Sequence, residues 1–272
     1  MKRHFLSAIL IAAGLLILAP GCSKNPLEIE EEDPTIGLQQ IASGYAVGAA
    51  AKLEIYARNA LSAGYTPLFL AIYDSITNRR IEDAVVQVKP MMNMGAMEHS
   101  APAENPVSNR AVDKLFPCSV TFTMPTVEMG AWRLEITVRQ AGKEGRLSVP
   151  VTVSDPAYSR VRSFVSKVNG DKLIAAYIEP SKPKVGVNDM EMAIYRVKGM
   201  DYLPDSSLTV KLTPEMPSMG HGSPNNVDPA HIGNGHYRGK ANFTMTGLWR
   251  LNLAFYLEDA IAEDTQFFEV NF

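Results

Sequence analysis

Apolar and polar residues alternate over short stretches of this chain. The clearest stretches are residues 85–88, 132–138 and 208–212, where every second side chain is apolar. Because successive side chains of a β-strand point to opposite faces of a sheet, a period of two predicts strands with one buried face. Gly, Pro, Asn and Asp separate these stretches, and no long helical period follows the N-terminal segment. The pattern predicts an all-β protein made of antiparallel β-sandwiches.

The sequence contains an internal repeat of two copies. Residues 64–73 align without a gap with residues 186–195, and both segments begin with Gly and end in Ala-Ile-Tyr. Two more matched pairs follow in the same order: residues 120–124 with 241–245, and, after a short insertion, residues 130–134 with 247–251. Ordered landmarks of this kind indicate a duplication.

The repeat also predicts the domain boundaries. We expect Trp132 and Trp249, which open equivalent strands, to fill the space between the sheets of each copy. The last strands would be residues 147–153 and 266–270. The predicted organisation is a signal peptide at 1–21, a flexible tether at 22–44, a first sandwich at 45–156, a connector at 157–168 and a second sandwich at 169–272.

The N-terminus has the organisation of a bacterial export signal. Lys2 and Arg3 precede an apolar core at residues 5–18, which is too short and wrongly flanked for a spanning helix. The small residues before Cys22 resemble a lipobox, whose cysteine is acylated, although Ala19 stands where that box usually has Leu. We predict a lipoprotein anchored to the membrane through Cys22, with an ordinary cleaved signal as the alternative.

The residues after Cys22 bear on the location of the mature chain. By lipoprotein sorting rules, Ser23 resembles a signal for the outer membrane. We therefore expect a lipid-anchored protein of the bacterial cell envelope, in the outer rather than the inner membrane. The acidic run at residues 28–33 is expected to be a solvated tether, and a surface-export tag is the other hypothesis.

Charge and cysteine content narrow the function classes. The formal net charge is −3, and loss of Lys2 and Arg3 with the signal makes the mature chain more acidic. An acidic chain argues against nucleic acid as a partner. With Cys22 acylated, Cys118 has no partner for an intrachain disulfide. We expect Cys118 to be a small buried residue on a strand, with metal ligation as the alternative.

Methionine and histidine gather in two short segments bounded by prolines. Residues 90–102 read Pro-Met-Met-Asn-Met-Gly-Ala-Met-Glu-His-Ser-Ala-Pro, and residues 214–224 read Pro-Glu-Met-Pro-Ser-Met-Gly-His-Gly-Ser-Pro. Thioether and neutral imidazole are the donors that Cu(I) prefers. Because proline interrupts regular structure, we expect loops at both places. Eight side chains are candidate metal ligands: Met216, Met219, His221 and His236 in the second copy, and Met91, Met94, Met97 and His99 in the first.

The donor set leaves alternatives open. In the second copy, His236 would reach the loop from a neighbouring strand, so that two histidines and two thioethers converge. Cu(II) would use the histidines more heavily, and zinc fits less well because no cysteine pair or histidine–carboxylate cluster has zinc spacing. The methionines could instead fill gaps at the open end of each sandwich, or serve as sacrificial targets of oxidation.

Four short motifs follow one another in the second copy. They are Gly-Val-Asn-Asp at 186–189, Met-Pro-Ser-Met-Gly-His at 216–221, Gly-His-Tyr-Arg-Gly at 235–239 and Phe-Thr-Met-Thr-Gly-Leu-Trp-Arg-Leu at 243–251. This order resembles the YtkA-like and FixH-like modules of bacterial envelope proteins. The resemblance covers residues 172–272 well and residues 52–153 loosely, because the first copy lacks Gly-His-Tyr and has Leu-Phe-Pro-Cys at 115–118 instead.

The resemblance implies two tandem immunoglobulin-like sandwiches outside the cytoplasm. Some relatives are associated with cytochrome oxidase assembly or stand beside copper efflux components, which implies partners of that kind. No nucleophile elbow, phosphate-binding glycine loop or His-Glu-x-x-His pair occurs, so we expect no enzyme. Two hypotheses remain: a tethered module that binds or buffers copper, and a metal-free tandem adaptor that holds another envelope protein.

Overall fold

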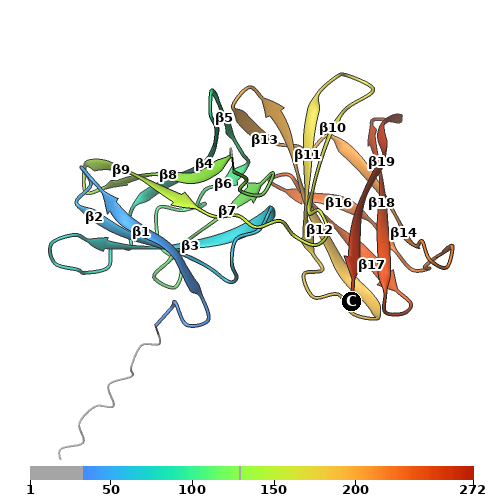
Figure 1. Cartoon of the computed structure of the whole chain (residues 1–272), viewed down its shortest axis with the longest axis horizontal. Coiled ribbons are helices and arrows are strands. Elements are labelled where there is room, and N and C mark those ends of the chain that lie inside the picture. Colours follow the sequence, from blue (N-terminus) through green and yellow to red (C-terminus); the bar gives the residue numbers. More distant parts are fainter. Residues whose placement is uncertain (1–32, 129) are drawn as a thin grey trace, which may run out of the picture. The chain divides into compact units, whose positions relative to one another are not determined.

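The computed structural model describes residues 33–128 and 130–272, so the predicted signal peptide, Cys22 and the first part of the tether lie outside it. Within these ranges the regular structure consists of strands alone (Figure 1). The described residues accordingly include no helix with the length and apolar character needed to cross a membrane. The all-β prediction is confirmed.

The N-terminal sandwich consists of two antiparallel sheets. The first has the strand order β1 (Gln39–Ala46), β2 (Ala51–Ala57), β3 (Gly64–Asp74), β7 (Phe116–Phe122) and β6 (Ala103–Glu104). The second has the order β5 (Met97–Ser100), β4 (Val85–Met94), β8 (Ala131–Gln140) and β9 (Lys143–Val151).

The C-terminal sandwich repeats this arrangement and adds one strand to the first sheet. Its first sheet has the order β10 (Val161–Val165), β11 (Lys172–Glu179), β12 (Gly186–Lys198), β17 (His236–Phe243) and β16 (Val227–Gly233), and β13 (Asp201–Pro204) pairs with β12. Its second sheet has the order β15 (His221–Gly222), β14 (Leu208–Met216), β18 (Leu248–Leu257) and β19 (Ala260–Asn271).

Each sandwich has a hydrophobic core of its own. On β8 and β14 buried and exposed side chains alternate, as the period of two predicts. Trp132 is 1% exposed and belongs to the first core, and Trp249 is fully buried in the second. Both indoles therefore lie between the sheets, as expected.

The strands extend beyond the stretches predicted from the sequence in two places. β1 begins at Gln39, inside the segment expected to be tether, and pairs with β2 along its length. β10 lies inside the expected connector and pairs with β11. Both strands lie at a sheet edge, and their mixed burial gives a weak alternation signal.

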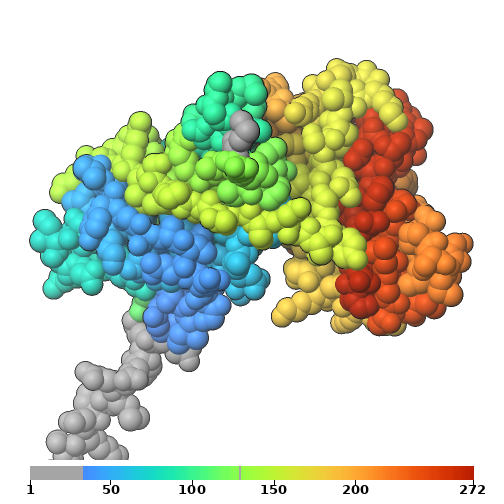
Figure 2. Space-filling model, in the orientation of Figure 1, coloured from blue at the N-terminus to red at the C-terminus, as the bar shows by residue number. Residues whose placement is uncertain are grey.

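Two hairpins bring the sandwiches into contact. The Tyr202 hydroxyl on β13 donates to the Ser100 carbonyl on β5 at 2.7 Å, and the Ser100 hydroxyl donates to the Met200 carbonyl. Figure 2 shows the corresponding green and orange surfaces beside each other. The Ser100 backbone is thus held next to His99, a predicted metal ligand.

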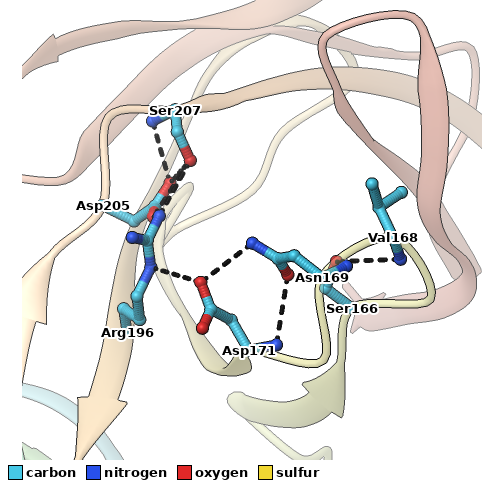
Figure 3. A network of polar contacts seen from close by, with 7 residues as sticks. All are labelled: Ser166, Val168, Asn169, Asp171, Arg196, Asp205 and Ser207. Carbon is cyan, nitrogen blue, oxygen red and sulfur yellow. Dashed lines mark hydrogen bonds and ion pairs between the residues drawn. The ribbon is translucent and has the colours of Figure 1, made fainter.

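A polar network fixes the ends of β11, β12 and β13 (Figure 3). The Arg196 guanidinium lies between two carboxylates, with Nε 3.1 Å from Asp171 and Nη2 2.6 Å from Asp205. The Asp205 side chain is 1% exposed, so its charge needs this partner. The network joins elements of the C-terminal sandwich alone.

Candidate functional site

The methionine-rich segment of the first copy is a β-hairpin rather than a loop. β4 runs through Pro90 to Met94 and β5 returns from Met97, with the loop glycine Gly95 at φ 76°. Pro90 is tolerated because β5 pairs with β4 only from Met91 onward, so no strand needs the missing N–H on that side. The flanking proline therefore did not interrupt the strand.

Register places one set of donors on a single face of this hairpin. Met92 is directly opposite His99, and Met94 is opposite Met97. Directly opposed residues of an antiparallel pair point to the same face, and so do residues two apart on one strand. Met91 therefore lies on the opposite face of β4, where it is 6% exposed.

Three thioethers and one imidazole line a cavity of about 350 Å³ at this hairpin. The donors are Met92, Met94 and Met124 with His99. Met92 is 1% exposed, Met94 is half-buried, and His99 is exposed to solvent. The cavity is completed by Ser100, Thr123, Val161, Ser163, Lys172, Ile174 and Tyr202. The donors therefore range from Met92, which is buried, to Met124 and His99, which are exposed. Met97, at 60% exposure, does not line it.

The second copy repeats the methionine–histidine pair. Met216 ends β14 and is directly opposite His221, the first residue of β15. Met216 is buried in the core of the sandwich, whereas Met219 in the intervening loop is 58% exposed. The His221 ring lies edge-on to Trp249 at 6.0 Å between centroids, and its Nδ1 is 3.0 Å from the Gly222 carbonyl oxygen.

Two further details relate the two hairpins. A side-chain carbon at Gly130 would lie 2.8 Å from the Met92 methyl, and one at Gly247 would lie 2.9 Å from the Met216 methyl. The indole N–H of Trp132 donates to the Met124 carbonyl at 3.0 Å. That of Trp249 donates to the Met245 carbonyl at 3.0 Å. In both copies the methionine opposite the histidine therefore packs under a glycine, and a tryptophan donates to the carbonyl of a second methionine.

The structure does not bring His236 together with Met216, Met219 and His221. His236 begins β17, and the neighbouring Tyr237 accepts a hydrogen bond at its hydroxyl from Leu208, the first residue of β14. Met216 is the last residue of β14, which at 3.3 Å per residue is about 26 Å away along the strand. The expected convergence of two histidines and two thioethers is therefore not what the topology provides.

Both nitrogens of His236 instead contact carboxylates. Nε2 is 2.9 Å from Glu104 Oε1, and Nδ1 is 2.8 Å from Glu191 Oε1. Arg238 donates to the other oxygen of Glu191 at 2.8 and 3.0 Å. The Tyr65 ring lies edge-on to the imidazole at 5.7 Å. We call His236, Glu104, Glu191 and Arg238 the carboxylate–histidine cluster.

The two carboxylate oxygens of Glu104 accept hydrogen bonds from different sandwiches. Oε2 accepts from Tyr65 at 2.9 Å and from Ser119 at 3.0 Å, both in the N-terminal sandwich. Oε1 accepts from Tyr195 at 2.6 Å and from His236, both in the C-terminal sandwich. Since the Glu104 side chain is only 17% exposed, these bonds replace most of its hydration.

The ionisation of the cluster follows from these contacts. Hydrogen bonding to Glu104 raises the pKa of His236, burial opposes that rise, and hydrogen bonding to Glu191 adds to it. Burial alone would raise the pKa of Glu104, but hydrogen bonds from His236, Tyr195 and Tyr65 lower it overall. Both shifts favour the charged forms of the pair.

Other potential ligands are accounted for within the described ranges. No group of three or more His, Cys, Asp or Glu side chains there has the arrangement of a metal site. Cys118 is a free, buried thiol on β7, and burial raises its pKa to about 12.

Sequence reasoning left out Met92 and Met124 as ligands and Glu104 altogether. The period of two could have identified Met92, because it places Met92 and Met94 on one face and Met91 on the other. Glu104 gives no comparable signal, since it is one acid on a strand of two residues and its histidine partner is 132 residues away.

Comparison with known proteins adds little beyond the fold. No curated protein matches the chain. Among solved structures it is similar to FdeC, an Escherichia coli adhesin, at 14% identity and a TM-score of 0.26, covering 84% of this chain and 65% of that one. It is also similar to invasin, a bacterial integrin-binding protein (10% identity, TM-score 0.23, 82% and 39%). Domains 5–6 of the S-layer protein SbsC are also similar, at 12% identity and a TM-score of 0.27. That match covers 86% of this chain and 97% of the SbsC chain.

The chain thus spans less than two thirds of the length of FdeC and of invasin. The sequence of the C-terminal sandwich is more informative than these structures. The YtkA-like resemblance is confirmed there, because residues 168–254 match the model of the YtkA-like family.

Proposed function

We propose that this protein binds a soft monovalent metal ion, Cu(I), in the cavity lined by Met92, Met94, Met124 and His99. The observation that carries the proposal is that these four donors line one cavity of about 350 Å³. Met92, Met94 and His99 share a face of one hairpin, so the backbone register preorganises them. Sulfur and imidazole are soft or borderline donors, which suits Cu(I) better than Mg²⁺ or Ca²⁺.

Charge in the cavity favours a monovalent ion over a divalent one. The three thioethers carry no charge, and the lining includes the lysine Lys172, which is exposed. Its ammonium repels any cation in the cavity, and that repulsion doubles for a divalent ion. Without a carboxylate among the lining residues, nothing there compensates a second positive charge.

The rest of the proposal concerns the setting. We propose that the N-terminal sandwich is a second, diverged YtkA-like copy, related to FixH-like modules, and the equivalent Trp–Met contacts support this. The chain would be a lipoprotein anchored through Cys22 in the bacterial envelope, in the outer membrane rather than the inner. There it would receive or buffer copper and pass it to an efflux or oxidase-assembly partner.

Titration of the purified full-length chain with Cu(I), without oxygen and against a chromogenic competing chelator, tests this function. We expect one tightly bound ion in the N-terminal site. Replacing Met92, Met94 and Met124 by Leu and His99 by Gln should weaken that binding by about a hundredfold or more, since it removes the ligands themselves. Leucine has nearly the volume of methionine, so the fold should be retained.

The second hairpin supplies a matched control. Met216→Leu with Met219→Leu and His221→Gln removes the corresponding groups of the other copy and should leave the tight site intact. If Cu(I) binding is lost in this C-terminal variant and kept in the N-terminal one, the metal binds in the C-terminal sandwich, and the proposed site is contradicted. A chain that binds no Cu(I) in competition would favour the metal-free adaptor.

A further inference from the structure

The carboxylate–histidine cluster spans the contact between the two sandwiches. Glu104 lies on β6 of the N-terminal sandwich, whereas His236 and Glu191 lie on β17 and β12 of the C-terminal one. The Nε2 contact of His236 with Glu104 therefore crosses between sandwiches, and its Nδ1 contact with Glu191 stays within one. One imidazole connects two separately folded cores.

The geometry favours an imidazole that carries two protons. A carboxylate can only accept hydrogen bonds, and a neutral imidazole has one N–H. With oxygens 2.9 Å from Nε2 and 2.8 Å from Nδ1, a neutral ring would oppose a lone pair to a carboxylate oxygen at one of the two contacts. The imidazolium satisfies both contacts and makes each one charge-assisted.

Protonation also balances the charge of the cluster. The ionisable groups that face His236 or its carboxylate partners are Glu104 on β6, Glu191 on β12, Arg238 on β17, Tyr65 on β3 and Tyr195 on β12. Burial raises the pKa of both tyrosines, so they stay neutral. Two carboxylates then face one guanidinium and one imidazolium. Loss of the imidazole proton leaves one unbalanced negative charge.

The same contact determines how the metal cavity is enclosed. Val161, Ser163, Lys172, Ile174 and Tyr202 form the wall that the C-terminal sandwich contributes, whereas all four proposed ligands belong to the N-terminal one. The wall therefore stays in place only while the sandwiches stay together. Hydrogen bonds from Tyr195 to Glu104, from Tyr202 to Ser100 and from Ser100 to Met200 also cross this contact. The hydroxyl groups that donate them do not lose their protons near neutral pH, so the pH dependence comes from His236.

We propose that His236 is a proton-dependent latch, which in its protonated form holds the two sandwiches together and encloses the metal cavity, and which releases the C-terminal wall when it loses its proton. The part of this inference that concerns the cavity rests on the proposed copper function. The latch itself rests on the cluster alone.

The direction of the pH effect follows from the two shifts. Because the pKa of His236 is raised, its contribution is complete below its ordinary pKa, about 6.5, and is lost as the pH rises through the raised value. Because the pKa of Glu104 is lowered, its contribution is complete above its ordinary value, about 4.5, and is lost as the pH falls through the lowered one. The latch is closed between these limits.

A spin-label distance measurement tests the latch without metal. Labels at Ile76→Cys and Ile261→Cys, both exposed positions, would report one sandwich each in a full-length chain carrying Cys22→Ser. Cys118 is buried and should remain unlabelled. We expect a narrow distance distribution at about pH 6 and a broad one at about pH 9. His236→Gln should be broad at both pH values, because Gln is uncharged and has both N–H donors on one nitrogen, so it does not reproduce the two opposed contacts of the imidazolium.

His231→Gln is the matched control, since His231 lies in the same sandwich and contacts the Tyr237 ring without a carboxylate partner in the contacts described. It should keep the pH dependence of the wild type. A distribution that is narrow at both pH values in the wild type, or unchanged by His236→Gln, would overturn the latch.

A second measurement links the latch to the cavity. At about pH 6 the transfer of bound Cu(I) to a chelator should be about tenfold faster from His236→Gln than from the wild type, because one charge-assisted hydrogen bond no longer opposes opening. Equal transfer rates would overturn control of the cavity by the latch. Failure to bind Cu(I) at all would defeat the proposed function while the distance result still decides the latch.

Discussion

Replacing Trp249 by alanine should lower the free energy of unfolding of the C-terminal sandwich by about 3–5 kcal/mol. The indole is fully buried, packs against Phe243 at 5.5 Å between ring centroids and donates to the Met245 carbonyl. Alanine would leave a large cavity between the sheets and an unsatisfied carbonyl. Since domains are stable by only about 5–15 kcal/mol, urea denaturation followed by circular dichroism would show a large shift of midpoint.

Trp249→Phe is the control for this substitution. It removes the indole N–H but keeps an aromatic ring, so it should cost clearly less than alanine. Trp132→Ala should have an effect of the same size on the N-terminal sandwich, because Trp132 makes the same bond to Met124 and contacts Phe122 at 5.2 Å. A loss below about 1 kcal/mol at either site would contradict the assignment of the tryptophans to the cores.

Glu104→Ala should lower the free energy of unfolding by about 3 kcal/mol. The substitution removes one carboxylate but strands its four partners, Tyr65, Ser119, Tyr195 and His236, in a largely buried contact. The largest share of this cost comes from the imidazolium, which would keep Glu191 but lose its carboxylate partner at Nε2. Urea denaturation at about pH 6, where His236 is protonated, is the appropriate measurement.

Glu98→Ala gives the comparison for an exposed ion pair. Glu98 contacts Arg133 at 2.9 Å on the surface, where water screens the charge, so its loss should leave the midpoint nearly unchanged. Equal effects of Glu98→Ala and Glu104→Ala would show that the carboxylate–histidine cluster contributes no more than a surface pair.

The β-sandwich architecture was predictable from local pattern. Alternation along residues 132–138 and 208–212 gives the strands β8 and β14 because side-chain direction in a strand depends only on position along it. The repeat placed Trp132 and Trp249 in equivalent cores. Edge strands such as β10 were not predicted, since their side chains are only partly buried and the alternation is weak.

The site was predictable in part, for a physical reason. The sequence identifies the segments rich in Met and His, but treats their prolines as strand breakers. Pro90 lies within β4 because the adjacent strand begins one residue later, a fact set by tertiary pairing. Once the hairpin is known, its register selects Met92 and Met94 and sets Met91 on the other face.

Contacts between segments far apart in the chain could not be predicted from the local sequence pattern. His236 was singled out as a metal ligand because it lies near other soft donors in the sequence. Its neighbours in space are instead Glu104 and Glu191, which belong to other strands. The alternation pattern of a strand carries no information about such pairs, because their formation depends on how the two sandwiches meet.

X-ray absorption at the copper edge of the Cu(I)-loaded full-length chain tests the central claim most directly, because it identifies the atoms bound to the ion. We predict mixed sulfur and imidazole scattering, with the sulfur contribution lost on replacing Met92, Met94 and Met124 by leucine and kept in Met216→Leu. A spectrum with nitrogen and oxygen ligands alone, or sulfur scattering that survives the triple substitution, would contradict the account.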